Sequence, residues 1–415
     1  MTRTIVLGLA LLIAPPAPGL LAGQARPPRP PTGDAAAAPR PRPIVRARFE
    51  LLANGVFVPV YVNGKGPFLF ELDTGSDMSM VASETAPRIG IHTRGTMRGM
   101  GAGSGSVRMA MIPRLELSLP GGPVMSTTEA GTASMAGLWP LIARRIDGDL
   151  GYDVLKHYVV AIDYEHRVVA LYDPATWRYD GRGTSRPFTL WGDYDPQIAG
   201  ALVVAGRPPI PVRYTLDTGA GGVLATSPLV RSEHLRESLP VLPSPSHGIG
   251  NGVSQDLLAR TAAFEIGPYR LDRPLLALSQ DTVGSLAHAS LGVNLGGSVL
   301  RRFTVIIDYP HQRLILEPNA GFREPFAADA SGLVLEAEGT DYRTFVVRGV
   351  VPGSPASKAG FRERDVVAGI DGRDVSHYAL WQLQDVLKDT GRTYRVTVRR
   401  GRQRSVMTLH LRSML

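Results

Sequence analysis

The sequence predicts a mainly β protein in which two similar β lobes are followed by a small α+β domain. Three observations support this fold class. Strand-type patterns fill the chain up to about residue 320, two blocks of sequence recur in its two halves, and the pattern changes after residue 325. Recurrence at a fixed spacing indicates a structural duplication. A chain of 415 residues is long enough for two or three domains that each bury a core.

The first lobe opens with a hairpin pattern. Valine occupies every second position from 56 to 62 and is followed by Asn63-Gly64, and Asn-Gly is a strong hairpin signal. Further strands or hairpins are predicted at 107–119, 159–172 and 305–316. Helical signals are brief, and the best candidates are 232–239 and 297–302. The polar, turn-rich stretch 174–187 is predicted to connect the two halves.

The tripeptide Asp-Thr-Gly occurs twice, at 73–75 and 217–219, each time at the end of an apolar run. The two Asp residues lie 144 positions apart, at 73 and 217. A second block, 150–166, recurs at 295–311 with an offset of 145. A nearly constant offset over two separate blocks indicates an internal repeat. Two equivalent halves would each bring one carboxylate to a shared site, as hydrolysis by an acid–base Asp pair requires.

With these features the chain resembles the aspartic proteases, both the retroviral type and the two-lobed pepsin type. In that family each half contributes a strand that ends in Asp-Thr-Gly, a glycine-rich hairpin flap and a later apolar-Gly segment near the catalytic turn. The resemblance covers roughly 45–320 and implies an aspartic endopeptidase whose substrate is a protein or peptide. It implies catalytic roles for Asp73 and Asp217, hydrogen bonds across the two turns from Thr74 and Thr218, and sharp backbone turns at Gly75 and Gly219. The apolar-Gly segments are Leu150-Gly151 and Leu295-Gly296.

Each half also has a glycine-rich stretch between its two repeated blocks, at 99–105 and 248–252. The resemblance implies that these are the flaps, with flap residues Gly99, Gly101, Gly103, Gly248 and Gly250. Many family members have a flap tyrosine, whereas no Tyr lies between Met80 and Pro140. The resemblance to the family therefore does not extend to substrate positioning by that tyrosine.

Two carboxylates about 3 Å apart cannot both ionise easily, so they share one proton and titrate as a pair. The ionised member acts as general base toward a water, and the protonated member hydrogen-bonds the scissile carbonyl. This chemistry requires no metal and no other cofactor, and we expect none. The sequence does not indicate which Asp carries the proton.

The N-terminus has the features of an export signal. Arg3 supplies a positive charge, 5–14 is an apolar run too short to span a bilayer, and small residues follow up to Ala25. We therefore expect a signal peptide over 1–25 and an exported protein, either periplasmic or secreted. No other run of 18 apolar residues occurs, so no transmembrane segment is expected in the mature chain. The chain has no Cys, which excludes disulfides and a lipid-modified cysteine anchor.

After residue 325 the chain resembles a bacterial-type PDZ domain. The Pro-Gly-Ser-Pro-Ala segment at 352–356 and the following Ala-Gly at 359–360 carry this resemblance. It implies that a partner tail is captured as an added strand, with its C-terminal carboxylate at an apolar-glycine loop. The residues that match this loop are Gly332, Leu333, Val334 and Leu335. Val334 replaces the second glycine of the loop, and the alternative is an ordinary first strand of the domain.

We expect five segments along the chain: a signal peptide at 1–25, a disordered Pro/Arg-rich tether at 26–44, protease-like lobes at 45–178 and 185–322, and a PDZ domain at 327–415. The composition of the tether cannot bury enough apolar surface to offset the entropy of ordering it.

Other site types are weaker interpretations of this sequence. The glycine-rich stretch 99–105 is followed by a strand pattern rather than a helix, which argues against a nucleotide-binding loop. The net charge of +8 comes from Arg spread through the chain, so no nucleic-acid partner is predicted. No His pair has the helical spacing of a zinc site. Asp163 and Asp308 recur in the repeat but lie in strand context, which favours structural hydrogen bonds.

Two other functional classes remain open from the sequence. In one, the protein keeps the protease fold but acts as a peptide-binding scaffold through its PDZ domain. In the other, catalysis requires a homodimer in which Asp residues pair across chains. Both Asp-Thr-Gly copies are intact, which argues against a decayed enzyme, and two halves in one chain make dimerisation unnecessary.

Overall fold

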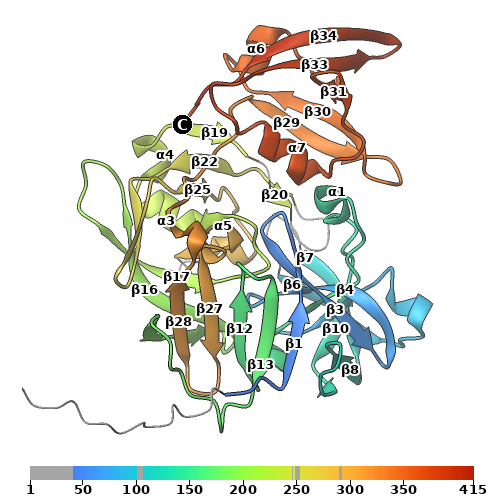
Figure 1. Ribbon diagram of the computed structural model, residues 1–415, viewed down its shortest axis with the longest axis vertical. Helices are drawn as coiled ribbons and strands as arrows, with labels where there is room; N and C mark the ends of the chain where they lie inside the picture. Colours follow the sequence, from blue (N-terminus) through green and yellow to red (C-terminus); the bar gives the residue numbers. More distant parts are fainter. Residues whose placement is uncertain (1–40, 101–105, 245, 248–252, 289–291) are drawn as a thin grey trace, which may run out of the picture. The chain divides into compact units, whose positions relative to one another are not determined.

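The computed structural model describes residues 41–415 except 101–105, 245, 248–252 and 289–291 (Figure 1). The predicted signal peptide and nearly all of the predicted tether lie outside the described residues. Within the described part of the chain, no helix is long and apolar enough to cross a membrane.

The first lobe is built on one large sheet with the strand order β6-β7-β10-β5-β11-β4-β3-β8-β9, and β2 pairs with β3. Its strands are β2 Glu50–Leu52, β3 Gly55–Val62, β4 Lys65–Leu72, β5 Met80–Ala82, β6 Arg94–Met100, β7 Ser106–Ile112, β8 Leu115–Ser118, β9 Met125–Thr127, β10 Ala130–Ala133 and β11 Gly148–Leu150. The short helices η1 (Ala86–Ile89) and α1 (Trp139–Ile142) lie between strands. The Asn-Gly turn joins β3 to β4 as predicted.

The second lobe repeats this plan in the order β19-β22-β25-β18-β26-β17-β16-β23-β24, with β15 on β16. Its strands are β15 Thr189–Trp191, β16 Asp195–Val203, β17 Ile210–Leu216, β18 Val223–Ala225, β19 Val241–Pro243, β22 Leu257–Arg260, β23 Ala263–Ile266, β24 Tyr269–Asp272, β25 Leu275–Leu278 and β26 Val293–Leu295. A separate pair is formed by β20 (Ser246–His247) and β21 (Val253–Ser254). The helices are α3 Ser227–Ser232, α4 Leu235–Ser238 and η3 Ser285–Ala287.

A third sheet joins the halves in the order β1-β13-β12-β27-β28-β14 (Figure 1). Its strands are β1 Val45–Arg48, β12 Val159–Asp163, β13 Val168–Tyr172, β14 Thr184–Pro187, β27 Phe303–Asp308 and β28 Arg313–Pro318. The equivalent strands β12 and β27 pair antiparallel at the centre, where Ala161 lies opposite Ile306. One turn of helix precedes each of these strands, α2 (Tyr152–Leu155) and α5 (Gly297–Leu300).

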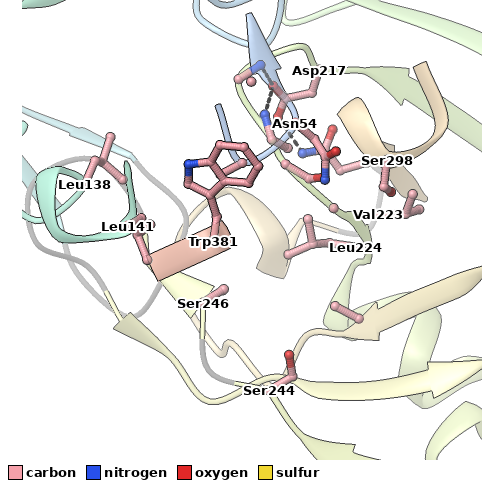
Figure 2. A pocket seen from close by; sticks show the side chains of 18 of the residues that line it. Asn54, Leu138, Leu141, Asp217, Val223, Leu224, Ser244, Ser246, Ser298 and Trp381 are labelled. Atoms are coloured by element: carbon pink, nitrogen blue, oxygen red, sulfur yellow. Dashed lines mark hydrogen bonds between the residues drawn. The ribbon is translucent and has the colours of Figure 1, made fainter. Parts of the chain in front are cut away.

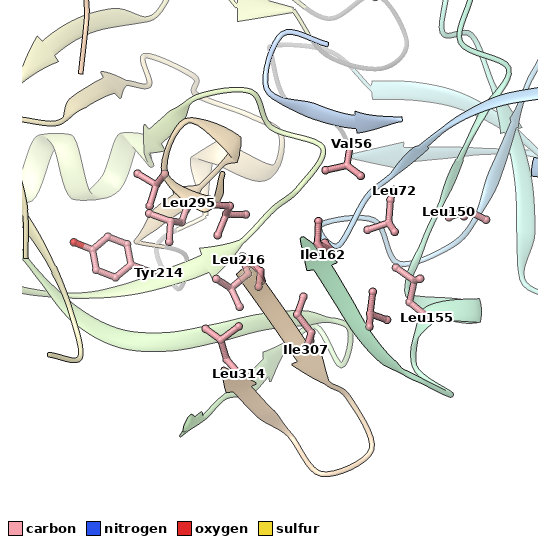
Figure 3. Close-up of a cluster of buried hydrophobic side chains, with 14 of the residues drawn as sticks. Val56, Leu72, Leu150, Leu155, Ile162, Tyr214, Leu216, Leu295, Ile307 and Leu314 are labelled. Carbon is pink, nitrogen blue, oxygen red and sulfur yellow. The ribbon is translucent and has the colours of Figure 1, made fainter. Parts of the chain in front are cut away.

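The two lobes and the joining sheet share one hydrophobic core (Figure 3). Equivalent positions of the repeat are buried together: Leu72 and Leu216 end the Asp-bearing strands, and Ile162 and Ile307 lie on the central pair. Each such side chain contributes about 1.5–3 kcal/mol when it leaves water completely. The shared core therefore holds the ends of the two Asp-bearing strands on one rigid base.

The C-terminal part forms a separate sheet in the order β29-β30-β31-β33-β34, with β32 on β31. Its elements are β29 Leu333–Glu338, β30 Thr344–Val350, α6 Pro355–Ala359, β31 Val366–Ile370, β32 Arg373–Asp374, α7 Leu380–Val386, β33 Thr393–Arg400 and β34 Gln403–His410, and η4 (Ala320–Arg323) precedes them. This sheet and its helices enclose their own hydrophobic core.

The motif at 352–360 has a clear physical role in this domain. The Ser354 side chain accepts a hydrogen bond from Ser357 N and so caps helix α6. Pro355 lies in the first turn of the helix, where a backbone N–H would have no acceptor within the helix, so its absence costs no hydrogen bond. Gly360 ends the helix in the left-handed conformation, with a φ of 85°. Behind it, the buried Asp365 carboxylate accepts two hydrogen bonds from Arg400, at 2.7 and 2.8 Å.

Several predicted elements have different bounds in the structure. The stretch 107–119 is divided into β7 and β8 at Pro113, which cannot donate a ladder hydrogen bond. The prediction of a helix over 232–239 is met only by α4 (Leu235–Ser238), which lies inside this range. Helix α3 begins earlier, at Ser227, and ends at Ser232, and His234, with a φ of 49°, separates the two helices. The stretch 174–187 is not only a connection, since its end forms strand β14.

Candidate active site

The two Asp-Thr-Gly turns occupy equivalent places at the ends of β4 and β17. In each half the Asp-bearing strand pairs in parallel with the strand of the apolar-Gly segment, β4 with β11 and β17 with β26. Asp73 N donates to Leu150 O at 3.0 Å, and Asp217 N donates to Leu295 O at 3.2 Å. The repeated leucines thus hold the backbone at the start of each turn, which gives the second repeated block the same structural role in both halves.

Reciprocal hydrogen bonds between the threonines join the two turns. Thr74 N donates to Thr218 Oγ1, and Thr218 N donates to Thr74 Oγ1, both at 3.1 Å. Each hydroxyl then donates to a carbonyl of the opposite strand: Thr74 Oγ1 to Leu216 O at 2.7 Å, and Thr218 Oγ1 to Leu72 O. Both threonines are completely buried. The sequence predicted these residues as partners across the turns, and the structure places them in contact.

The glycines of the two turns lie against the opposite carboxyl groups. A methyl group on Gly75 would lie 2.8 Å from Asp217 Cγ, and one on Gly219 would lie 2.6 Å from Asp73 Cγ. Side-chain carbons do not approach other atoms so closely. Each carboxyl therefore occupies the space that the opposite glycine leaves free, which brings Asp73 and Asp217 together between the turns.

Hydrogen bonds hold both carboxyl groups in place. Gly75 N donates to Asp73 Oδ1 at 2.9 Å. Gly219 N and Ala220 N donate to Asp217 Oδ1 at 2.9 and 3.0 Å, and Asn294 Nδ2 donates to Asp217 Oδ2 at 2.6 Å. Burial, followed by the nearby carboxyl groups of Asp217, Asp149 and Glu71, raises the pKa of Asp73 well above its usual range. A buried carboxyl of this kind is suited to carry a proton.

Three further carboxyl groups lie near the pair, and the sequence analysis did not identify them. Glu71 and Asp149 are opposite one another on β4 and β11, and burial is the main cause that raises the pKa of each. Asp195 begins β16, and burial together with Asp217 and Asp77 raises its pKa to about 9. For Glu71 and Asp149 the available signal was a charged residue next to a repeated motif, whereas Asp195 lies beside neither motif in the sequence.

A cavity of about 1470 Å³ surrounds the pair. Asp73, Asp217, Glu71, Asp195 and Asn294 line it together with apolar side chains from both lobes. The labelled side chains in Figure 2 show Leu138, Leu141 and Trp381 projecting into the space that also contains Asp217. A cavity of this size accommodates several residues of a peptide and provides an apolar surface for its side chains.

The predicted flap residues are only partly described. Strands β6 and β7 form a hairpin that includes Gly99, opposite Val107. Met97, Gly99, Val107 and Met109 of this hairpin line the cavity. Gly101 and Gly103 lie outside the described residues, as do Gly248 and Gly250, although β20 and β21 flank the second stretch as an antiparallel pair. The first hairpin is therefore located where a flap over the site would be expected.

The predicted peptide-binding loop lies at the start of β29. Gly332 has a φ of 77°, a left-handed conformation that glycine adopts readily, and a methyl group there would lie 2.3 Å from Ser354 Cβ. Leu333, Val334 and Leu335 follow as the first residues of β29, which is an edge strand that pairs only with β30 in the described sheet. An edge strand offers the unpaired backbone groups that strand addition requires. Helix α1 of the first lobe contacts both β29 and α7.

The repeated Asp residues of the joining sheet end strands β12 and β27, directly before the hairpin turns. Asp163 accepts hydrogen bonds from His166 N at 3.0 Å and from the His166 ring at 2.8 Å. Asp308 contacts the His311 ring in the same way and also pairs with Arg313. These contacts account for Asp163 and Asp308 as structural residues, as the sequence context indicated.

Comparisons with known proteins agree with this geometry. Residues 58–154 match a family model described as aspartyl protease, and residues 346–400 match one described as PDZ domain. The C-terminal processing peptidase of the chloroplast from Tetradesmus obliquus is 34% identical over 93 residues, which are 21% of this chain and 20% of that protein. The match thus spans about a fifth of the length of that relative.

Two solved structures are also similar. An aspartic proteinase from Irpex lacteus aligns with a TM-score of 0.45 and 14% identity over 68% of this chain and 98% of that one. A photosystem II D1 C-terminal processing protease aligns with a TM-score of 0.21 and 25% identity over 23% of this chain and 26% of that one. From the two family matches, we conclude that this chain contains an aspartyl protease domain and, nearer its C-terminus, a PDZ domain.

Proposed function

We propose that the protein is an aspartic endopeptidase that hydrolyses peptide bonds with a water activated between Asp73 and Asp217. The observation that carries this proposal is the reciprocal pair of threonine hydrogen bonds, which holds the two Asp-Thr-Gly turns face to face in one chain. The pair lies in a cavity large enough for a peptide. Because both halves belong to one chain, the site needs no second copy.

The chemistry follows from one shared proton. The ionised carboxylate takes a proton from the water while the water oxygen attacks the scissile carbonyl carbon. The protonated carboxyl donates a hydrogen bond to the carbonyl oxygen, on which negative charge develops. A proton then passes to the amide nitrogen, the C–N bond breaks, and a carboxylic acid and an amine leave. The hairpin of β6 and β7 lines the cavity and is suited to cover a bound peptide and exclude water.

The PDZ domain is proposed to recruit the substrate or a partner tail. The edge of β29 supports this role, because in the described sheet this strand pairs only with β30, and strand addition requires such unpaired backbone groups. Gly332 and Leu333 line the same cavity as the Asp pair. A peptide held by the PDZ domain thus raises the local concentration of cleavable segments near the site. We also propose that the protein acts after export, on the basis of the signal-type segment at 1–25.

Hydrolysis by the purified protein tests the proposed activity. An unfolded protein is incubated with the enzyme in the presence and absence of a statine-type transition-state mimic, and the new N-termini are identified by mass spectrometry. We expect internal cleavages that the mimic suppresses and that a metal chelator leaves unchanged. Peptide binding without cleavage would favour the scaffold alternative. Activity that is second order in protein concentration would favour a homodimer.

A further inference from the structure

The two halves of the active site differ at the residue that precedes the apolar-Gly segment. Asp149 precedes the apolar-Gly segment in the first half, and Asn294 precedes it in the second. Both lie on strands that pair in parallel with the Asp-bearing strands, where Asp149 faces Glu71 and Asn294 faces Thr215. The first half therefore has two buried carboxyl groups beside its catalytic Asp, whereas the second half has two neutral polar side chains.

The hydrogen bonds of the two catalytic carboxyl groups differ in the same sense. Among the described residues, Asp217 accepts from three donors: Gly219 N, Ala220 N and Asn294 Nδ2. Asp73 accepts from one, Gly75 N. Asp149 does not supply the missing contact to Asp73. Its Oδ1 accepts from Met80 N at 2.6 Å, and its Oδ2 has no hydrogen-bond partner.

These contacts favour opposite charge states. An amide N–H can only donate, and a carboxylate that accepts two or three such bonds is stabilised in its ionised form. Asp73 has fewer donors, and burial, followed by the nearby carboxyl groups, raises its pKa. One of these groups is Asp149, and the neutral Asn294 occupies the equivalent position beside Asp217. When the pair holds one proton, the lower-energy arrangement is a charge on Asp217 and a proton on Asp73.

We propose that Asn294 is a positioning residue that fixes the negative charge of the pair on Asp217 and leaves the shared proton on Asp73. Given the proposed endopeptidase function, on which the roles rest, Asp217 is then the general base toward water and Asp73 donates to the scissile carbonyl. The substrate water loses its proton to Asp217, and the carbonyl oxygen gains its hydrogen bond from Asp73.

Other titratable groups near the pair do not reverse this assignment. Asp195, at the start of β16, and Asp77, four residues after Asp73, line the same cavity as the pair. Tyr194 lies near both catalytic carboxyl groups, and Tyr309 lies near that of Asp73. Burial raises the pKa of Asp195 to about 9 and is the main cause that raises the pKa of Asp77, which favours the neutral form of both. The tyrosine hydroxyls are neutral at acidic pH because their ordinary pKa is near 10. Tyr164 is likewise neutral and lies near Asp217.

The pH profile of kcat/KM tests the role of Asn294 with three variants. Asn294→Asp replaces the donor by a carboxyl of the same size. We expect the acid limb of the kcat/KM profile to move to higher pH by at least about one unit, which is a tenfold lower kcat/KM at a given pH on that limb. Asn294→Leu removes the donor without adding charge and moves the same limb less. Asp149→Asn is the mirror-image control, and it moves the basic limb down because Asp73 loses its proton more easily. Unchanged limbs, or Asn294→Asp and Asp149→Asn moving the same limb, would overturn the proposal.

A second measurement does not depend on activity. The carboxyl carbons of protein labelled with ¹³C-Asp are titrated by NMR, and the Asp73→Asn and Asp217→Asn variants assign the two resonances. We expect the Asp217 resonance to shift to its ionised position before that of Asp73, and Asn294→Asp to remove this order. Ionisation of Asp73 first contradicts the inference even in an active enzyme. A protein that shows the expected order but hydrolyses nothing contradicts the proposed function alone.

Discussion

Replacing Thr218 by Val perturbs the contact that joins the two turns. The change keeps the shape of the side chain but removes Oγ1, which accepts from Thr74 N and donates to Leu72 O. These two partners, Thr74 N and Leu72 O, belong to buried residues. A buried polar group left without a partner costs about 1–3 kcal/mol, so two such groups cost about 2–6 kcal/mol. This is a large part of the stability of a typical domain, which is about 5–15 kcal/mol.

The assay compares wild type, Thr218→Val and Thr218→Ser. Urea unfolding gives the loss of stability, and we expect Thr218→Val to lower the midpoint by an amount that corresponds to this range, with Thr218→Ser close to wild type because it keeps the hydroxyl. The value of kcat/KM should fall about 100-fold or more in Thr218→Val, since a displacement of about 1 Å between the turns is enough for such a loss. An unchanged midpoint together with unchanged kcat/KM would refute the reasoning.

Three further predictions concern the same region and its neighbours. Asp195→Asn should flatten the pH dependence of stability: the folded protein holds the Asp195 proton up to about pH 9, whereas the unfolded chain releases it near pH 4, so wild-type stability falls by up to about 1.4 kcal/mol per pH unit between these values. Parallel urea midpoints of the two proteins from pH 4 to 8 would contradict this. Gly219→Ala should lower kcat strongly, because its methyl group would lie 2.6 Å from Asp73 Cγ, whereas Gly222→Ala, which has open space on the same cavity wall, should change it little. Removing 327–415 should preserve hydrolysis of short peptides but weaken cleavage of a protein substrate at low concentration, and an equal loss on both would rule out recruitment by the PDZ domain.

The sequence predicted those parts of the fold that depend on local pattern and on the repeat. The hairpins at the Asn-Gly turn and at 159–172 need only alternation and a turn signal, and both are present. The resemblance to the aspartic proteases implied that Leu150 and Leu295 lie near the two catalytic turns, and in the structure each accepts a hydrogen bond from the Asp of its own half. The motif at 352–360, which carries the PDZ resemblance, is equally local, although its role in capping α6 is visible only in the structure.

The remaining features depend on contacts between distant segments. Asn294 appears in the sequence as one polar residue in a short strand, and its role is visible only when β26 lies beside β17. The same applies to Glu71 and Asp149, whose proximity to Asp73 follows from the parallel pairing of β4 with β11. Strand β14 was missed because its alternation is weak, and it is formed by pairing with β28.

The most direct test of the central claim is the turnover of the two single Asp variants. Asp73→Asn and Asp217→Asn are compared with wild type and with Asp163→Asn, a matched change at a repeated Asp that ends strand β12, on the same unfolded protein substrate. We predict that each catalytic variant loses hydrolysis while its circular dichroism spectrum and urea midpoint remain close to wild type, and that Asp163→Asn retains activity. Near wild-type turnover by either catalytic variant, in preparations free of contaminating protease, would contradict the claim that the two carboxyl groups form the catalytic pair.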